Sequence, residues 1–370
     1  MRILFVATNI PIPGTHGGST HVTEVVRALR RRHEVLVLAQ RGSSGEGIAD
    51  VGLGGASGAL RYALALLHFP LAYGHARRFR PDAVYERFSA YGLGVLLGRA
   101  LGVPVVSMVL DPAATRITLE GADRLITTAP QLIAERYRHK VVEVSWGANT
   151  DLFHPGVGGR EVRRGLGVSD DEVLVGYTGA FYRWHGLETL IAAAALLDRD
   201  PAAAKLRFLL VGDGKMRADT EAQIQAAGLG RRFLLPGRVP YEQVPAYVAA
   251  SDICVAAYDP DRHPELQRHG MFFDPLKVFE YLAVGKATVT LDSPNMRRLF
   301  TDGEHALLVP PGRPEPLAAA LLRAGGDPAL RERLGRAGRE LVVARHSWQA
   351  HGDRLGELFE ELVEARRHHR

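Results

Sequence analysis

Short apolar runs alternate with longer amphipathic stretches along almost the whole chain. The runs have the length of strands buried on both faces of a parallel sheet. Between them, apolar positions recur at the three- and four-residue spacing of a helix. This alternation predicts an α/β fold with parallel sheets. The expected strands are residues 3–7, 34–38, 83–85, 104–109, 125–127 and 141–144, then 173–178, 207–211, 232–235, 253–257, 287–291 and 306–308.

The alternation is interrupted near residues 149–157, where turn-forming side chains lead into a cluster of glycines. Because 370 residues are long for a single hydrophobic core, we expect two domains, residues 1–153 and 154–346. Ligands of open parallel sheets bind outside the carboxyl ends of the strands. Two such domains would face a central cleft, and we expect the chemistry there.

Two segments of the first domain depart from the alternation. Residues 41–58 are rich in glycine and serine and predict a flexible surface loop. Residues 59–78 have a helical pattern in which Pro70 is expected to cause a kink or a break. Its apolar part, residues 63–73, leads into three arginines, so a helix on a membrane surface or on a partner is one interpretation. A core helix with a solvated end is better supported.

The most informative stretch is residues 271–286, which predicts a short helix over 275–284. Asp274 is a good N-cap because its carboxylate can accept from the free amides of the first turn. Pro275 suits the first helical position, and Gly285 suits a left-handed stop. The apolar run that follows predicts a strand, so this helix should belong to a layered domain.

Lys277 and Glu280 are three residues apart in this helix and would share one face. The free amides and partial positive charge of a helix N-terminus bind phosphate, and the Lys277 ammonium would strengthen such a site. The Glu280 carboxylate, one turn further along, could accept from a pair of hydroxyls. Phosphate beside a diol describes the sugar end of a nucleotide. An ordinary surface ion pair is the alternative, but only five of the 46 basic residues are lysines.

Three further loops after strands of the second domain carry glycine where a backbone could approach a ligand: residues 179–186, 212–215 and 237–239. With the helix they would supply a cationic rim, which consists of Arg183, His185, Lys215 and Lys277. In the first domain, Gly17 and Gly18 lie between the first strand and a helical pattern. That arrangement brings backbone close to phosphate in open α/β sheets, although a plain connecting loop is the alternative.

Composition narrows the classes of partner. A net charge of +5 fits an anionic ligand, an acidic membrane surface or nucleic acid. The sequence lacks the basic–aromatic repeats that proteins use to bind single-stranded nucleic acid, so no nucleic-acid partner is expected.

The single cysteine, Cys254, excludes an internal disulfide framework and suits a reducing compartment. The N-terminus predicts a strand and not a signal peptide. We therefore expect a cytoplasmic protein, with peripheral membrane contact through the basic first domain as an option.

Four motifs, in this order, resemble the retaining glycosyltransferases of the GT-B fold, in particular the GT4 family. They are Asp-Leu-Phe-His-Pro at 151–155, Leu-Leu-Val-Gly-Asp-Gly at 209–214, Phe-Leu-Leu-Pro-Gly-Arg-Val at 233–239 and Lys-Val-Phe-Glu-Tyr-Leu-Ala-Val-Gly-Lys at 277–286. The first is similar to the family's linker and the last to its nucleotide-sugar helix. The resemblance covers nearly the whole chain, and it implies that a last helix, residues 347–370, packs back on the first domain.

The resemblance implies a hexosyltransferase that moves a sugar from a UDP- or GDP-linked donor to an acceptor hydroxyl, with retention and without metal or cofactor. The donor would bind mainly to the second domain, with Glu280 on the ribose hydroxyls. The catalytic candidates are Lys277, Arg183 and Glu280. The donor-binding candidates are Gly17, Gly18, His185, Lys215, Gly237, Arg238, Val239, Asp274, Pro275 and Leu276. The acceptor-side candidates are His21, Glu86, Arg87 and Asp111, for which a structural ion pair or cap is the alternative.

The chain departs from the family pattern at three places. Phe272 stands where the first glutamate of the family's E-x7-E motif is expected, and Ala180 stands where relatives have a diphosphate-binding arginine. Arg183 could substitute for that arginine, and His185 replaces or shifts a lysine. Two other functions stay open. One is a nucleotide-sugar 2-epimerase, which would consume donor without acceptor, and the other is a non-catalytic subunit that binds a sugar nucleotide.

Overall fold

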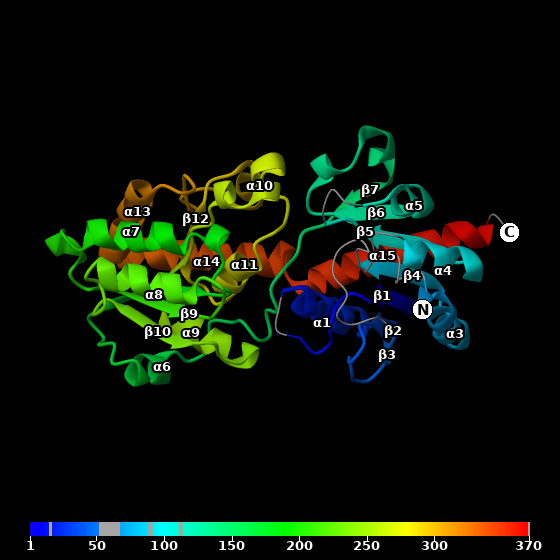
Figure 1. Cartoon of the computed structure of the whole chain (residues 1–370), viewed down its shortest axis with the longest axis horizontal. Coiled ribbons are helices and arrows are strands. Elements are labelled where there is room, and N and C mark those ends of the chain that lie inside the picture. Colours follow the sequence, from blue (N-terminus) through cyan, green and yellow to red (C-terminus); the bar gives the residue numbers. More distant parts are fainter. Residues whose placement is uncertain (15–16, 52–66, 88–91, 111–113, 369–370) are drawn as a thin grey trace. The chain divides into compact units, whose positions relative to one another are not determined.

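The computed structural model describes residues 1–14, 17–51, 67–87, 92–110 and 114–368, which form two compact units (Figure 1). The first unit consists of Met1–Trp146 and Trp348–Arg370, and the second unit is Gly147–Ser347. Residues 147–153, which we expected in the first domain, therefore group with the second unit. Each unit is built on one parallel sheet.

The sheet of the first unit has seven strands in the order β3-β2-β1-β4-β5-β6-β7. The strands are β1 (Arg2–Ala7), β2 (Glu34–Ala39), β3 (Ile48–Asp50), β4 (Ala83–Arg87), β5 (Val105–Met108), β6 (Arg124–Thr127) and β7 (Val141–Glu143). The described helices are α1 (Gly17–Leu29), α3 (Phe69–Phe79), α4 (Leu93–Leu101), α5 (Arg116–Gly121) and α15 (Trp348–His368), with 3-10 turns η1 (Pro130–Leu132) and η2 (Glu135–Lys140). Every strand that we expected here from an apolar run is confirmed.

One detail of the first unit differs from the expectation. β3 lies within the glycine-rich segment that we predicted to be a loop, and Ile48 pairs with Val37 of β2. Ala49 is buried, so even this short apolar run suffices to extend the sheet. The break that we expected at Pro70 is present, because Leu67 is helical, His68 is not, and a new helix, α3, begins at Phe69. Pro70 lies in the first turn of α3, where its missing N–H leaves no helical hydrogen bond unmade. Residues 52–66, part of the expected loop and helix, lie outside the described residues.

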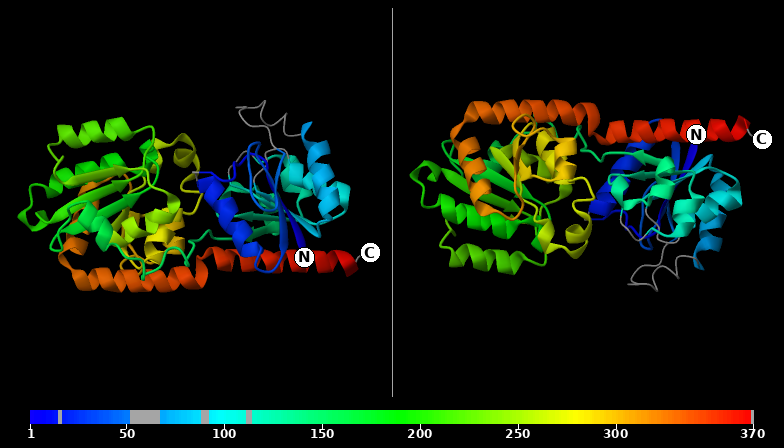
Figure 2. Two further views of the ribbon diagram at one scale, coloured as in Figure 1. Left: turned by 90° about the horizontal axis from the view of Figure 1, so that it is seen from below. Right: turned by 90° about the horizontal axis from the view of Figure 1, so that it is seen from above.

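The C-terminal helix α15 packs on α1, which confirms the expectation for the last helix. Gly352 permits the close approach, since a Cβ at this position would lie 2.4 Å from the Cβ of Ala28 on α1. Leu355 and Phe359 of α15 are fully buried. Figure 2 shows α14 (Pro328–Arg345) running along the second unit and α15 along the first. No helix in the described part of the chain is both long and apolar enough to cross a bilayer.

The sheet of the second unit has six strands in the order β10-β9-β8-β11-β12-β13. They are β8 (Val173–Thr178), β9 (Leu206–Val211), β10 (Phe233–Gly237), β11 (Ile253–Ala256), β12 (Ala287–Leu291) and β13 (Leu307–Val309), as expected from the apolar runs. The strand order reverses at β8, which lies between β9 and β11. In doubly wound sheets such a reversal is where ligands bind, outside the carboxyl ends of the strands.

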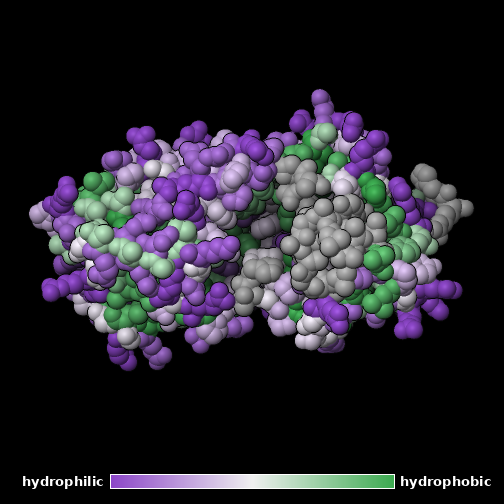
Figure 3. Space-filling view, in the orientation of Figure 1, coloured by the Kyte–Doolittle hydropathy of each residue, from purple (hydrophilic) through white to green (hydrophobic). Residues whose placement is uncertain are grey.

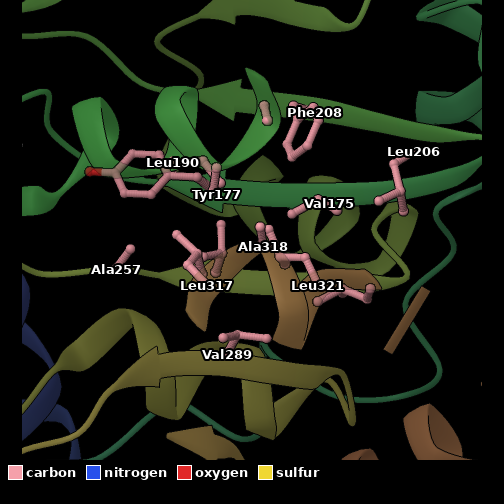
Figure 4. Close-up of a cluster of buried hydrophobic side chains, with 14 of the residues drawn as sticks. Val175, Tyr177, Leu190, Leu206, Phe208, Ala257, Val289, Leu317, Ala318 and Leu321 are labelled. Atoms are coloured by element: carbon pink, nitrogen blue, oxygen red, sulfur yellow. The ribbon is translucent and has the colours of Figure 1, made fainter. Parts of the chain in front are cut away.

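The helices of the second unit cover both faces of this sheet. The α-helices are α6 (Arg160–Gly165), α7 (Leu187–Leu197), α8 (Arg217–Ala226), α9 (Val244–Ala250), α10 (Pro264–His269), α11 (Leu276–Ala283), α12 (Pro294–Leu299), α13 (Pro314–Gly326) and α14. The 3-10 turns are η3 (Arg183–His185), η4 (Pro201–Ala203), η5 (Tyr241–Gln243) and η6 (Pro260–Arg262). In the core drawn in Figure 4, Val175 of β8 and Phe208 of β9 lie in one cluster with Leu190 of α7 and Leu317 of α13. Cys254 of β11 is also buried, and burial raises the pKa of its thiol to about 12, so it acts as a small apolar side chain.

α11 is the short helix predicted from the 271–286 stretch, but its start differs from the prediction. Pro275 is the N-cap residue, so the helix begins one residue later than expected, and the cap has no side-chain hydrogen bond. Asp274 is buried, with its carboxylate 3.5 Å from the guanidinium of Arg298. A buried carboxylate is costly unless a cation lies beside it. Asp274 is therefore paired with Arg298 and does not cap the helix. Gly285 follows the helix with a φ of 79°, which confirms the left-handed stop.

We expect Gly352→Ala to lower the free energy of unfolding by about 1–3 kcal/mol, because the added methyl would push α15 away from Ala28. The matched control is Gly74→Ala in α3, where a Cβ would meet no atom within 4 Å. Replacing that helical glycine should stabilise the protein by about 0.5–1 kcal/mol. Thermal unfolding of both variants measures the difference, and equal effects would contradict the close packing of α15 on α1.

Candidate functional site

The glycine loops of the second unit meet at the carboxyl ends of β8, β9 and β10. The Phe181 amide donates to the Asp213 carbonyl at 2.9 Å, and the Gly212 amide donates to the Gly237 carbonyl at 2.9 Å. A Cβ on Gly212 would lie 1.9 Å from the Gly179 carbonyl oxygen, so only glycine fits at this contact. Its φ of +143° is also one that other residues rarely adopt. The loops therefore present backbone at the edge where ligands of such sheets bind.

The side chain of Lys277, on α11, reaches this edge. Its Nζ donates to the hydroxyl of Tyr177 at 3.0 Å and lies 4.1 Å from the centroid of the same ring. The ring of Tyr258, just after β11, is 5.2 Å away. A Cβ on Gly179 would come within 2.8 Å of Nζ. The amine is thus held at the strand-order reversal, between two aromatic rings and a glycine.

Lys277 is a buried cation without an acid partner. Its side chain is 9% exposed, and no carboxylate of the described residues forms an ion pair with it. Burial lowers its pKa from 10.5 to about 7, and the charge of Glu280 opposes this shift only in part. An anion placed beside the amine would favour the charged form. A buried amine whose pKa is lowered and which forms no ion pair, at the carboxyl ends of the strands, is typical of a site whose counter-ion is a ligand.

His185 lies in the same network but does not contribute a positive charge. It is 8% exposed, with Nδ1 2.5 Å from the Ala180 carbonyl and 3.0 Å from the Tyr177 hydroxyl. Burial, followed by the charge of Lys277, lowers its pKa to about 2. The expectation that His185 belongs to a cationic rim is therefore wrong, because an imidazole buried beside an amine stays neutral.

Three other cations do reach solvent at this edge. Arg183, Lys215 and Arg238 are exposed, and they follow β8, β9 and β10 respectively. None of the three forms an ion pair with another described residue. The neighbouring helix α10 is also covered by hydrophilic residues in Figure 3. The three exposed cations and Lys277 therefore supply positive charge that is not paired with an acid among the described residues.

Glu280 lies one turn after Lys277 on α11 and is partly exposed. Its carboxylate accepts from the hydroxyl of Tyr241, which follows β10, at 3.0 Å. The Gly237 carbonyl is engaged with the glycine loops, and Val239 packs against a small apolar cluster. The structure therefore brings the predicted second-domain residues to one end of the sheet, with Glu280 toward β10 and Lys277 at the reversal.

Tyr177 and Tyr258, which enclose the Lys277 amine, were not among the residues expected from the sequence. Both are buried, and burial raises the pKa of each hydroxyl, so both stay neutral. A signal for them exists. Tyr177 stands near the carboxyl end of a strand that begins with three aliphatic residues, and Tyr258 comes two residues after the next strand of the sheet. A buried tyrosine hydroxyl needs a polar partner, and strand ends are where ligand-binding groups gather.

In the first unit the structure buries three of the predicted acceptor-side residues. Glu86 is fully buried, and its carboxylate accepts from the Gly94 amide in the first turn of α4 at 2.7 Å and from the Ser107 hydroxyl at 2.9 Å. Arg87 is 6% exposed and donates to Nδ1 of His21, which is itself fully buried. The hydrogen bonds of Glu86 and Arg87 inside the unit agree with a structural role, whereas Nε2 of the buried His21 has no hydrogen-bond partner among the described residues. Contact of these three residues with an acceptor stays a prediction.

The remaining first-unit candidates are less informative. Gly17 and Gly18 begin α1, and Gly17 is exposed. Their proposed contact with a donor stays a prediction. Asp111 lies outside the described residues.

Two family models match the chain. "Glycosyl transferases group 1" matches residues 160–341, and "Glycosyltransferase Family 4" matches residues 15–144. Together they cover most of both units, whose parallel sheets have the doubly wound strand order described above. The chain belongs to the GT4-type glycosyltransferases of the GT-B fold. The resemblance read from the four sequence motifs is thereby confirmed.

Individual relatives of this GT4-type chain include two enzymes from Streptomyces. Alpha-D-kanosaminyltransferase of Streptomyces kanamyceticus is 31% identical over 202 residues, covering 55% of this chain and 49% of that protein. 2-Deoxystreptamine N-acetyl-D-glucosaminyltransferase of Streptomyces fradiae is 27% identical over 281 residues, covering 68% of this chain and 63% of that protein. The match therefore spans less than two thirds of each. The crystal structure of Anabaena HepE in complex with UDP has the same fold, with a TM-score of 0.76, 17% identity and coverage of 98% of this chain and 100% of that one.

Removing the buried amine should stabilise the unliganded protein. At a pH below the folded-state pKa of about 7, the wild type carries the full cost of burying the Lys277 charge. Between that pKa and 10.5 the unfolded chain holds the proton and the folded chain does not, so this cost fades as the pH rises. We expect Lys277→Met to be more stable than wild type by a few kilocalories per mole near neutral pH, with the difference shrinking toward about pH 10. Denaturant unfolding across this range measures it. A variant less stable than wild type at neutral pH would refute the uncompensated charge.

Proposed function

We propose that this protein is a retaining glycosyltransferase that moves a sugar from a UDP- or GDP-linked donor to an acceptor hydroxyl. The observation that carries the proposal is the buried Lys277 amine without an acid partner, at the strand-order reversal of the second unit. A diphosphate supplies the missing negative charge, and it also suits loops that present backbone instead of side chains.

The order of groups along α11 matches the order of parts in such a donor. Glu280 is one turn further along the helix than Lys277 and could accept from the two ribose hydroxyls. The diphosphate would lie at Lys277, with the exposed Arg183, Lys215 and Arg238 as further partners. The sugar would then lie beyond the diphosphate, on the side away from the ribose.

The chemistry requires stabilisation of a leaving group that gains negative charge. The bond between the anomeric carbon and the phosphate oxygen breaks, and the nucleoside diphosphate leaves with the bonding electrons. The acceptor oxygen forms the new bond on the same face, and its proton passes to the leaving phosphate. Lys277 is positioned before the reaction and lies in an apolar environment, where a charge acts more strongly than in water. We propose that this cation, helped by the exposed arginines and lysine, replaces a metal ion.

Binding of UDP or GDP near neutral pH should be accompanied by proton uptake, because the ligand's charge raises the pKa of Lys277 from about 7. Titration calorimetry in buffers of different ionisation enthalpy counts the protons. Lys277→Met should weaken binding about tenfold or more and abolish the uptake. Glu280→Gln, the matched control on the same helix, should weaken binding but keep the uptake. A wild type that binds neither nucleotide would overturn the proposal.

Transfer should proceed in EDTA and give a product with the donor's anomeric configuration, as determined by NMR. The aminocyclitol in the name of the Streptomyces fradiae relative, 2-deoxystreptamine, is the first acceptor to test. Activity lost in EDTA and restored by a divalent cation would refute the metal-independent step. Donor consumed without acceptor would favour a 2-epimerase, and donor binding without turnover on any acceptor would favour a non-catalytic subunit.

A further inference from the structure

The hydroxyl of Tyr177 has three polar neighbours. It donates to the Ala180 carbonyl at 2.7 Å, accepts from the Lys277 amine at 3.0 Å and lies 3.0 Å from Nδ1 of His185. That Nδ1 is also 2.5 Å from the Ala180 carbonyl oxygen, so it must carry a proton. A hydroxyl has one proton and two lone pairs. The single proton on Nδ1 is directed at the same carbonyl, so Tyr177, with its own proton on that carbonyl, keeps its lone pairs for the Lys277 amine.

We propose that Tyr177 is a positioning residue for the donor diphosphate. Its hydroxyl and its ring hold the Lys277 amine beside the glycine loop without neutralising it, so that the diphosphate becomes the counter-ion. This inference rests on the function proposed above, and it adds to that function a residue and a role.

A tyrosine suits this role better than an acid. A carboxylate at the same place would form a buried ion pair with Lys277, and the ligand would have to break that pair before binding. The Tyr177 hydroxyl stays neutral because burial raises its pKa. The face of its ring, 4.1 Å from Nζ, adds an attraction for the charged form that leaves the ammonium's charge in place.

The orientation of Tyr177 is determined by its own strand and by the loop that follows it. The residue lies on β8, between two neighbouring strands, and is 1% exposed. Its ring packs edge to face on Phe181 at 6.0 Å. Ala180, whose carbonyl accepts the hydroxyl proton, and His185, which lies beside the hydroxyl, belong to the loop directly after the same strand. The hydroxyl therefore points toward Lys277 before any ligand is present.

The test compares two variants that each lose one buried hydroxyl. Tyr177→Phe keeps the ring beneath Lys277 and removes the acceptor. The matched control is Tyr281→Phe, because Tyr281 is also fully buried and its hydroxyl accepts from the Thr178 amide at 2.8 Å, one residue from Tyr177. Both variants are titrated with UDP and GDP at several pH values.

Loss of the acceptor should lower the pKa of Lys277 below its wild-type value of about 7. Tyr177→Phe should therefore bind the nucleotide about tenfold more weakly than wild type near pH 8, and recover most of this loss near pH 6. Tyr281→Phe should show a ratio to wild type that does not change with pH. A Tyr177→Phe profile that runs parallel to that of Tyr281→Phe would overturn the inference.

A second measurement is made on the wild type and uses one substitution only to assign a signal. Because the chain has only five lysines, 13C-labelled lysine should resolve the signal of Lys277 by NMR, assigned by its absence in Lys277→Met. The signal should be shifted by the Tyr177 ring both before and after UDP is added, and its titration should move to higher pH with UDP. Loss of the ring shift on binding would overturn the positioning role.

If no nucleotide binds to wild type at all, the proposed function itself fails. If nucleotide binding depends on Lys277 but not on Tyr177, only this inference fails.

Discussion

The candidate site depends on the burial of one amine, that of Lys277, against the ring and hydroxyl of Tyr177. Two opposing requirements meet there. The amine acts on a ligand most strongly where water is excluded, and the same exclusion makes its charge costly in the free protein. A pKa of about 7 is the compromise, since the group can lose its proton when the site is empty and regain it when an anion arrives. This arrangement requires glycine at positions 179 and 212. A side chain at position 179 would occupy the space beside the amine, and one at position 212 would separate the loops.

The rest of the second unit holds α11 in place from its far end. A Cβ on Gly335 of α14 would lie 2.0 Å from the Gly285 carbonyl oxygen, so α14 approaches the stop of α11 closely. Arg339 of α14 donates to the Ala283 carbonyl, in the last turn of α11, at 2.7 Å. The carboxyl end of α11 is thus capped by a cation. With that end held and its apolar side chains buried, the first turn, which carries Lys277, has little freedom to move away from β8.

Most of the fold could be predicted from the sequence, and the site only in part. Every strand expected from an apolar run exists, because parallel strands covered on both faces leave an unmistakable pattern. β3 was missed because it is too short to leave one. Lys277 and Glu280 could be found because Pro275 and Gly285 mark the ends of their helix. The neutral state of His185 and the role of Tyr177 could not, since both depend on contacts with a residue about a hundred positions away in the chain. The acceptor side had no comparable local markers.

The scarcity of lysine is not by itself a sign of function, as the partners of the other lysines show. Lys140 donates to carbonyls at the end of α5, Lys286 donates to the Ala249 carbonyl at the end of α9, and Lys205 pairs with Asp171. What distinguishes Lys277 is burial with a tyrosine, and no carboxylate or carbonyl of the described residues, as its hydrogen-bond partner. An arginine at the same position would remain charged in the empty site and would need room for its planar fork. An amine can discharge instead, which explains why a chain so rich in arginine carries a lysine here.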